Sequence, residues 1–127
     1  MKFFSIVCAF FAFFVFTAFA QAPLNAGIAI TSPVLSTEIK GGSNFTIAWT
    51  VLDKNATTIE KIGLWKGNAA YLTPVIVNIL TNGSIPVQPP QYVWQVPTNL
   101  TTESDYVLTV VGNNSYTSYS SYFGIKN

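Results

Sequence analysis

Residues 94–125 read WQVPTNLTTESDYVLTVVGNNSYTSYSSYFGI, and this stretch decides the fold. Tyr106, Leu108 and Val110 are large apolar residues at every second position, which is the pattern of a strand with one buried face. Tyr106 opens this strand six positions after the loop residue Leu100. A tyrosine in that place is typical of a tyrosine corner, where the ring packs inward and the hydroxyl bonds back to the preceding loop. We therefore expect Leu100 and Tyr106 to form a structural corner between two sheets.

The same period of two recurs along the rest of the chain and predicts further half-buried strands. The expected inward-facing residues are Phe45, Ile47, Trp49 and Val51, then Ile62 and Leu64, Val75, Val77 and Ile79, Tyr92, Trp94 and Val96, and finally Phe123 and Ile125. Turn-forming residues separate these segments, and the dipeptide Asn82-Gly83 predicts a tight hairpin. About seven to nine short strands with such punctuation indicate an all-β, immunoglobulin- or fibronectin-III-like β-sandwich.

The first twenty residues indicate a secreted protein. Lys2 precedes an almost unbroken apolar stretch from Phe3 to Phe19, and Ala18-Phe19-Ala20 places small residues where a signal peptidase cuts. We expect a cleaved signal peptide over residues 1–20 and one domain over residues 21–127. The alternative is a retained membrane anchor, because the apolar stretch approaches the about 18 to 20 residues that span a bilayer.

Charged and reactive residues are few, and this excludes several classes of function. Lys2 is one of six cations, so residues 21–127 carry five lysines and five carboxylates, a net side-chain charge of zero. The lysines are scattered singly, which argues against nucleic acid and anionic membranes as partners. Cys8 is the only cysteine and lies in the expected signal peptide, so we expect neither a disulfide nor a thiolate metal site.

The residues required by common catalytic sites are also missing or scattered. The chain has no histidine, which excludes Ser-His-Asp and Cys-His arrangements and histidine-ligated metals. The carboxylates Glu60, Glu103 and Asp105 leave a small glycoside hydrolase as a remote third class of function. We interpret them as solvated charges that keep strand edges and loops soluble, and we expect no enzyme activity, cofactor or metal.

Five Asn-X-Ser/Thr sequons predict N-glycosylation of a secreted protein. Their asparagines lie at expected turns or strand starts, where a glycan can leave the surface without breaking a ladder. They are Asn44, Asn55, Asn82, Asn99 and Asn113. The alternative is that asparagine serves only as a turn residue at some of these positions.

Aromatic residues are the better candidates for a binding site. Trp49 and Trp94 occupy the same alternate positions as the apolar residues expected in the core, so we interpret them as core-packing residues. Trp65 directly follows the expected core residue Leu64 in the strand, so its side chain is expected to point outward. Tyr116, Tyr119 and Tyr122 crowd the last expected hairpin. Outward rings can stack on sugars, so these four residues form a candidate glycan-binding surface, although aromatic residues also stabilise sheets through cross-strand pairs.

Several segments occur in the order of a known family. They are Ile30-Thr31-Ser32-Pro33, Gly41-Gly42 followed by Phe45-Thr46-Ile47-Ala48-Trp49, Ile62-Gly63-Leu64 with Gly67, Tyr92-Val93-Trp94-Gln95-Val96-Pro97, Asp105-Tyr106, and Ser118-Tyr119-Ser120 with Phe123-Gly124-Ile125. From about Ile28 to Ile125 the chain resembles the N-terminal Ig-like domain of fungal yeast-cell-wall-synthesis (Kre/Knh-like) proteins. The resemblance implies a secreted fungal protein of cell-wall assembly, linked in the best-known members to β-1,6-glucan, and it carries no catalytic residues.

These observations predict a secreted, glycosylated, non-enzymatic module of the fungal cell wall with structural or polysaccharide-binding contacts. The expected partner is a cell-wall polysaccharide. The alternative is an extracellular recognition or adhesion module whose partner is a protein. The polysaccharide-binding function predicts that the aromatic surface retains the protein on isolated walls, and the protein-recognition function does not.

Overall fold

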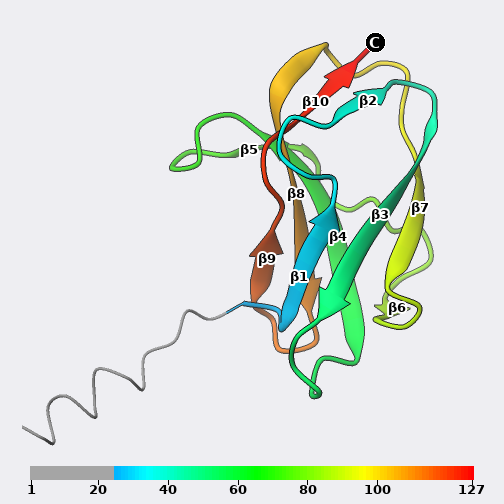
Figure 1. The fold of residues 1–127 in the computed structure, drawn as a ribbon, viewed down its shortest axis with the longest axis vertical. Helices are drawn as coiled ribbons and strands as arrows, with labels where there is room; N and C mark the ends of the chain where they lie inside the picture. Colours follow the sequence, from blue (N-terminus) through cyan, green and yellow to red (C-terminus); the bar gives the residue numbers. More distant parts are fainter. Residues whose placement is uncertain (1–24) are drawn as a thin grey trace, which may run out of the picture.

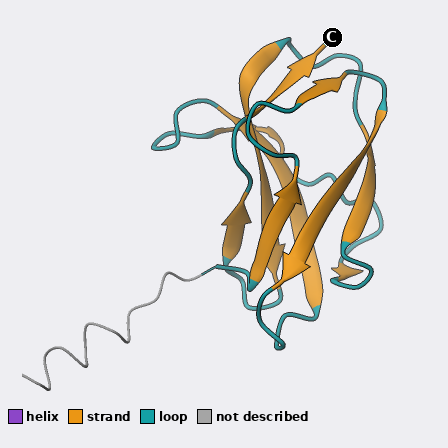
Figure 2. Cartoon of the chain, viewed as in Figure 1, coloured by secondary structure: helices purple, strands orange, loops and turns teal. Residues whose placement is uncertain are grey.

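The structure is a computed structural model that describes residues 25–127, so the expected signal peptide and its cleavage site lie outside the described residues. The described chain consists of strands joined by loops, without a helix (Figure 1 and Figure 2). In order they are β1 (Ile28–Ser32), β2 (Glu38–Lys40), β3 (Asn44–Val51), β4 (Thr58–Lys66), β5 (Thr73–Ile76), β6 (Ile85–Pro86), β7 (Gln91–Gln95), β8 (Glu103–Gly112), β9 (Thr117–Tyr119) and β10 (Phe123–Lys126).

The strands form two sheets that pack face to face. The smaller sheet has the order β1-β3-β7, and the larger has the order β2-β10-β8-β4-β5, with β6 added to β4 and β9 to β8. The pairs are antiparallel except for β2 with β10, which run parallel. The predicted all-β two-sheet sandwich is confirmed. The strand number is ten and exceeds the expected seven to nine, because β2, β6 and β9 are only two or three residues long.

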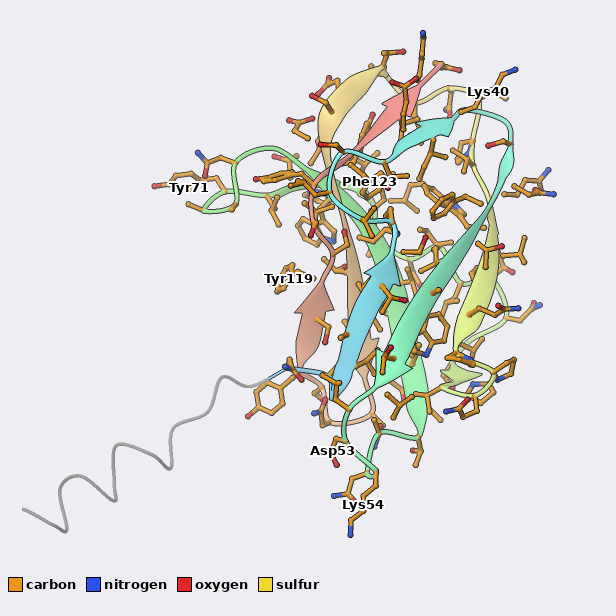
Figure 3. The ribbon with its side chains drawn as sticks, viewed as in Figure 1. Lys40, Asp53, Lys54, Tyr71, Tyr119 and Phe123 are labelled. Carbon is orange, nitrogen blue, oxygen red and sulfur yellow. The ribbon has the colours of Figure 1, made fainter. Side chains whose placement is uncertain are left out.

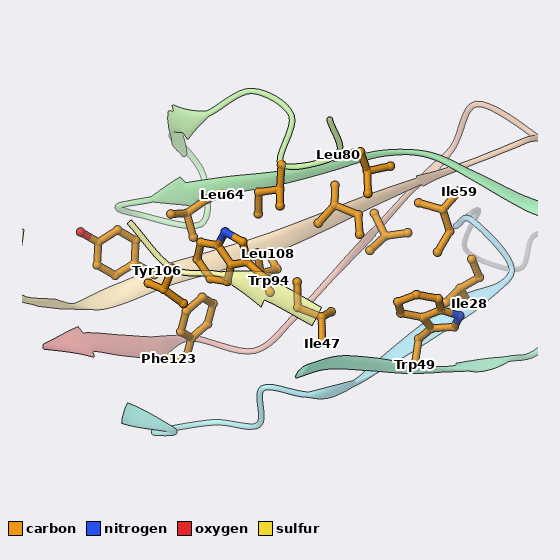
Figure 4. Packing of buried hydrophobic residues seen from close by; sticks show 14 of the residues in the cluster. Ile28, Ile47, Trp49, Ile59, Leu64, Leu80, Trp94, Tyr106, Leu108 and Phe123 are labelled. Carbon is orange, nitrogen blue, oxygen red and sulfur yellow. The ribbon is translucent and has the colours of Figure 1, made fainter. Parts of the chain in front are cut away.

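The core lies between the sheets and contains most of the residues that alternation assigned to it (Figure 4). Trp49 and Trp94 are both only 3% exposed, in agreement with their interpretation as packing residues. The indole N–H of Trp49 donates to the carbonyl of Val87 at 3.0 Å, so its polar atom is satisfied inside the core. Ile47, from the same face of β3, is fully buried.

Residues 100–106 close one end of the core. The Tyr106 ring is buried and lies 6.2 Å from the Phe123 ring, centroid to centroid. Its hydroxyl donates to the carbonyl of Thr101 at 2.6 Å and lies 3.1 Å from the Thr101 hydroxyl. Leu100 is buried beside this end of β8. The chain therefore turns from the smaller sheet into the larger one around a hydrogen-bonded tyrosine.

Two local expectations are wrong. Val77 does not face the core, because β5 ends at Ile76 and its register against β4 shifts between Leu64 and Trp65, which leaves Val77 62% exposed. The turn at Asn82-Gly83 does not close a hairpin, although Gly83 has the expected positive φ of 83°. The segments before and after it, β5 and β6, both pair with β4, one at each end.

Candidate functional site

The outer face of the larger sheet carries a patch of apolar and aromatic side chains. It includes those residues of β4 and β8 that lie between the core residues of each strand and so face away from the core. The register places Gly63 opposite Thr109 and Trp65 opposite Val107. Val107 and Thr109 are buried although they face away from the core. Other side chains must therefore cover them, which is unusual for the solvent side of a sheet.

Two adjoining grooves run over this face. The larger has a volume of about 510 Å³ and is lined by Ala69, Ala70, Leu72, Val107, Tyr119, Ser120, Ser121 and Tyr122. The smaller has a volume of about 200 Å³ and is lined by Lys61, Trp65, Leu72, Val77, Thr109, Val111, Thr117 and Tyr119. Leu72 and Tyr119 line both, so we treat the two together and call them the outer groove. Its lining contains one charged residue, Lys61.

The indole of Trp65 passes close to Gly63, two residues before it on β4. A Cβ on Gly63 would come within 2.8 Å of the indole nitrogen of Trp65 and within 2.8 Å of the Thr109 hydroxyl. Any larger side chain would therefore have to displace the Trp65 indole and the Thr109 hydroxyl. Trp65 is half-buried, so part of its ring is packed and part is open to the groove.

The loop between β4 and β5 forms one wall of the outer groove and projects from the body of the sandwich (Figure 1). The Tyr122 hydroxyl donates to the carbonyl of Gly67 at 2.8 Å, which ties the base of this loop to the β9–β10 connection. Asn68 organises the turn, since its side-chain oxygen accepts from the Ala70 amide at 2.9 Å. Tyr71 stands at the loop tip with 81% of its surface exposed, on the same side of the molecule as Tyr119 (Figure 3).

Hydroxyl groups accompany the rings. The Ser120 hydroxyl accepts from the Leu108 amide at 2.8 Å and donates to the carbonyl of Ser121 at 2.9 Å, so it fixes the chain after β9. Thr117 contributes a further hydroxyl to the lining. A groove of rings and neutral hydroxyls can stack on a flat apolar surface and exchange hydrogen bonds with its polar edge.

The structure brings together three of the four aromatic residues proposed from the sequence. Trp65, Tyr119 and Tyr122 all line the outer groove. Tyr116 does not, because it lies in the β8–β9 turn, where its carbonyl accepts from the Gly112 amide at 3.1 Å. Leu72 and Val77 also line the groove, and neither was predicted from the sequence as part of a binding site. Alternation could not identify Leu72, which lies in a loop, and it placed Val77 in the core.

The carboxylates lie elsewhere. Glu103 forms an ion pair with Lys66 at 3.1 Å and accepts from the Thr101 hydroxyl at 3.2 Å. The Lys66 ammonium lowers the pKa of Glu103, and the Glu103 carboxylate raises the pKa of Lys66. Glu60 is exposed and accepts from the Thr58 hydroxyl. Within residues 25–127 no three potential metal ligands of the His, Cys, Asp or Glu type come together.

The five sequon asparagines are all exposed and lie outside the lining of the outer groove. Two of them meet at one end of the sandwich. The Asn113 side chain donates to the carbonyl of Asn55 at 3.2 Å and accepts from the Thr57 amide at 3.0 Å. Asn113 therefore also joins the β8–β9 turn to the β3–β4 turn.

Comparison with known proteins gives a family. Residues 32–125 match the model of the Kre9/KNH-like N-terminal Ig-like domain, which covers most of the described chain. The chain belongs to this family. The resemblance identified from the order of its sequence segments is thereby confirmed, and so is the Ig-like character of the sandwich. No curated protein matches the chain.

Among solved structures, the chain is similar to the fibronectin(III)-like modules of Clostridium thermocellum CbhA. The two are 17% identical, the alignment covers 77% of this chain and 91% of that chain, and the TM-score is 0.41. Kre9/KNH-like Ig domains are associated with the yeast cell wall, and domains of this kind are typically non-catalytic. The chain is therefore a cell-wall-related or binding module. Its described part contains no helix that could span a membrane.

Proposed function

We propose that this Kre9/KNH-like domain is a secreted, non-enzymatic module of the fungal cell wall that holds an uncharged polysaccharide in the outer groove. The observation that carries the proposal is the convergence of Trp65, Tyr119 and Tyr122 on one groove. Rings presented on a sheet face can stack on the apolar faces of sugar rings, while neighbouring hydroxyls bond to the sugar hydroxyls.

The electrostatics of the groove support a neutral ligand. Lys61 is the one charged residue in its lining, and it lines only the smaller compartment, whereas Tyr122 lines only the larger one. An acidic polymer would need a cluster of cations, which the groove does not offer. Neutral glucans and chitin suit it better, and β-1,6-glucan is the polymer that the family resemblance implies.

The distribution of sequons supports the same face. The exposed asparagines Asn44, Asn55, Asn82, Asn99 and Asn113 all lie outside the groove lining. Glycans at these positions would cover other parts of the surface and leave this face accessible. A bare apolar face on an otherwise glycosylated domain is suited to contact with a ligand.

Sedimentation with insoluble β-glucan, chitin and isolated walls tests the proposal. Trp65→Ala and Tyr119→Ala each remove one ring from the groove and should lose most of the wall-bound fraction. Tyr116→Ala is the matched control, because Tyr116 lies on the same hairpin and is 45% exposed but outside the groove. Near-ultraviolet circular dichroism and thermal unfolding establish that each variant is folded.

We expect the parent and Tyr116→Ala to sediment with the polysaccharide, and Trp65→Ala and Tyr119→Ala to stay in solution. If folded Trp65→Ala and Tyr119→Ala sediment with walls as the parent does, the outer groove is not the wall-binding site. Retention would then depend on another surface, and recognition of a wall protein would replace the polysaccharide as the proposed role.

A further inference from the structure

The smaller sheet ends at β7, whose outer edge pairs with no other strand of the described residues. Its order is β1-β3-β7, so β7 pairs with β3 on one side only. The end of β5 and the segment after it approach β7 and line a groove with it through Ile76, Asn78, Ile79 and Thr81, without a main-chain hydrogen bond to its outer edge. This edge belongs to the sheet opposite the one that carries the outer groove. An open edge presents a row of main-chain donors and acceptors that another strand can pair with.

The register of β3 and β7 shows which main-chain groups are already used. The Trp49 amide donates to the carbonyl of Pro90 at 3.1 Å. At the other end, the Val96 amide donates to the carbonyl of Ser43 at 2.9 Å. Both pairs continue the register of the strands between them. Hydrogen-bonded pairs alternate in an antiparallel ladder, so every second residue of β7 is bonded to β3.

The bonded residues of β7 are therefore Tyr92 and Trp94, which pair with Ile47 and Phe45. The residues between and beside them direct their main-chain N–H and C=O groups to the open edge. They are Gln91, Val93 and Gln95. The Gln91 amide is an exception, because it already donates to the carbonyl of Pro89 at 2.8 Å. Val93 is at the centre, and its side chain is 57% exposed.

The sequence of β7, QYVWQ, is self-complementary when it runs antiparallel to a second copy. A twofold axis through Val93 sets Val93 opposite the same residue of the second copy. It also sets Gln91 opposite Gln95, so the amide side chains can pair on one face. On the other face the register sets Tyr92 opposite Trp94 of the second copy, but Trp94 is only 3% exposed and packs in its own core, so this pair adds little contact.

The other free edges carry features that block such pairing, and β7 carries none within its length. At one edge of the larger sheet, β2 places Glu38 and Lys40 on either side of its buried residue, and at the other edge β5 contains Pro74. The ladder of β1 is irregular between Ile30 and Ser32. Charges, prolines and bulges are the usual protection of edge strands.

The absence of charged residues around β7 also favours its pairing with β7 of a second copy. No charged residue occurs between Lys66 and Glu103, so two copies meet at this edge without repulsion. Pro89 and Pro97 alternate in step with Val93, flank the strand and lack an amide donor on its outer edge. They limit the ladder to the residues between them, which favours a single register centred on Val93.

We propose that a second copy of this chain binds at β7 by antiparallel strand addition, joining two three-stranded sheets into one continuous sheet of six. The interface consists of one short strand from each copy. Its area is small, so we expect a weak dimer that forms at high protein concentration. The outer groove of each copy stays open, because it lies on the other sheet.

Sedimentation velocity of the secreted protein from low micromolar to near-millimolar concentration tests the dimer. The parent should shift from monomer to dimer over this range. Val93→Lys places two like charges across the axis and should weaken association at least about tenfold. Val34→Lys is the matched control, because Val34 is 59% exposed in the β1–β2 loop, away from the edge, and should associate like the parent.

Cysteine cross-linking tests the register. The chain has no cysteine after Cys8, so Val93→Cys introduces a single thiol at the proposed axis. Under mild oxidation, Val93→Cys should form a disulfide-linked dimer far faster than Val34→Cys. A parent that stays monomeric throughout, equal weakening by both lysine variants, or equal cross-linking at both positions would overturn the proposal.

Discussion

At the residue scale, the Tyr106 hydroxyl connects the loop before β8 to the end of the core. It donates to the carbonyl of Thr101 at 2.6 Å, and its ring is 1% exposed. Tyr106→Phe keeps the ring and leaves that carbonyl without its partner, so we expect a loss of about 1 to 2 kcal/mol in the free energy of unfolding. Trp94→Ala opens a cavity in the core and should cost about 3 to 5 kcal/mol.

Chemical denaturation of the two variants beside the parent measures both effects. The parent should have the highest free energy of unfolding, Tyr106→Phe a lower one and Trp94→Ala the lowest. Neither residue lines the outer groove, so all three proteins should bind walls equally. An unchanged midpoint for Tyr106→Phe would show that the hydrogen bond does not stabilise the corner.

The ion pair of Lys66 and Glu103 should make part of the stability depend on pH. The Lys66 ammonium lowers the pKa of Glu103, so this carboxylate contributes stability above its unfolded pKa and loses it as pH falls through the lower folded value. Glu103 raises the pKa of Lys66, so that contribution is complete below the unfolded pKa and is lost as pH rises through the folded one. The pair is partly exposed, so the effect should be small and reduced by salt.

The measurement is the unfolding midpoint as a function of pH for the parent and Glu103→Gln. The variant should lose less stability than the parent on the acid side, where the parent protonates Glu103. Below that transition the two curves should approach each other. A constant difference between the two curves across the acid range would show that Glu103 acts through contacts other than its charge.

The outward position of Trp65 could be predicted from the sequence, because successive side chains of a regular strand point to opposite faces of the sheet. The sequence pattern placed Val77 wrongly, because alternation fails where the register shifts, here between Leu64 and Trp65. Leu72 was not predicted as part of the groove, since a loop has no period. Tyr116 was grouped with Tyr119 because they are close in sequence, whereas only Tyr119 lies on the paired part of β9.

At the element scale, the strands were easier to predict than their partners. Patterns of apolar residues identify a buried face locally, whereas pairing depends on contacts between distant segments. The Asn82-Gly83 turn shows the difference. Its backbone conformation at Gly83 was predictable from residue type, but the turn connects two segments that bind opposite ends of β4.

At the scale of the whole molecule, the grooves and the open edge lie on different sheets, so one contact does not block the other. A shallow groove with a few rings binds a sugar chain weakly. A dimer along β7 would present two such grooves to one insoluble polymer, and linked sites bind more tightly than either alone. Self-association at the edge would in this way strengthen retention on a wall without any change in the groove itself.

The last prediction uses glycosylation to mask the outer groove. We expect glycans on the exposed sequons, read as a gel shift after deglycosylation of the protein secreted by a fungal host, with wall binding retained in the glycosylated parent. Ala70→Thr creates a new sequon at Asn68, which is exposed and adjoins the groove residues Ala69 and Ala70. A glycan there would stand at the rim and exclude a polymer from the larger compartment. Ala70→Val is the matched control, because it has the shape of threonine but creates no sequon.

The masked variant should carry one more glycan than the parent by mass, unfold at a similar temperature and lose wall binding, while Ala70→Val binds normally. Enzymatic removal of its glycans should restore binding, which separates masking from a loss of fold. Asn68 already uses its side-chain oxygen to accept from the residue 70 amide, and a glycan on the nitrogen leaves that bond in place. If Ala70→Thr carries the added glycan and still sediments with walls as the parent does, the polysaccharide does not enter this groove.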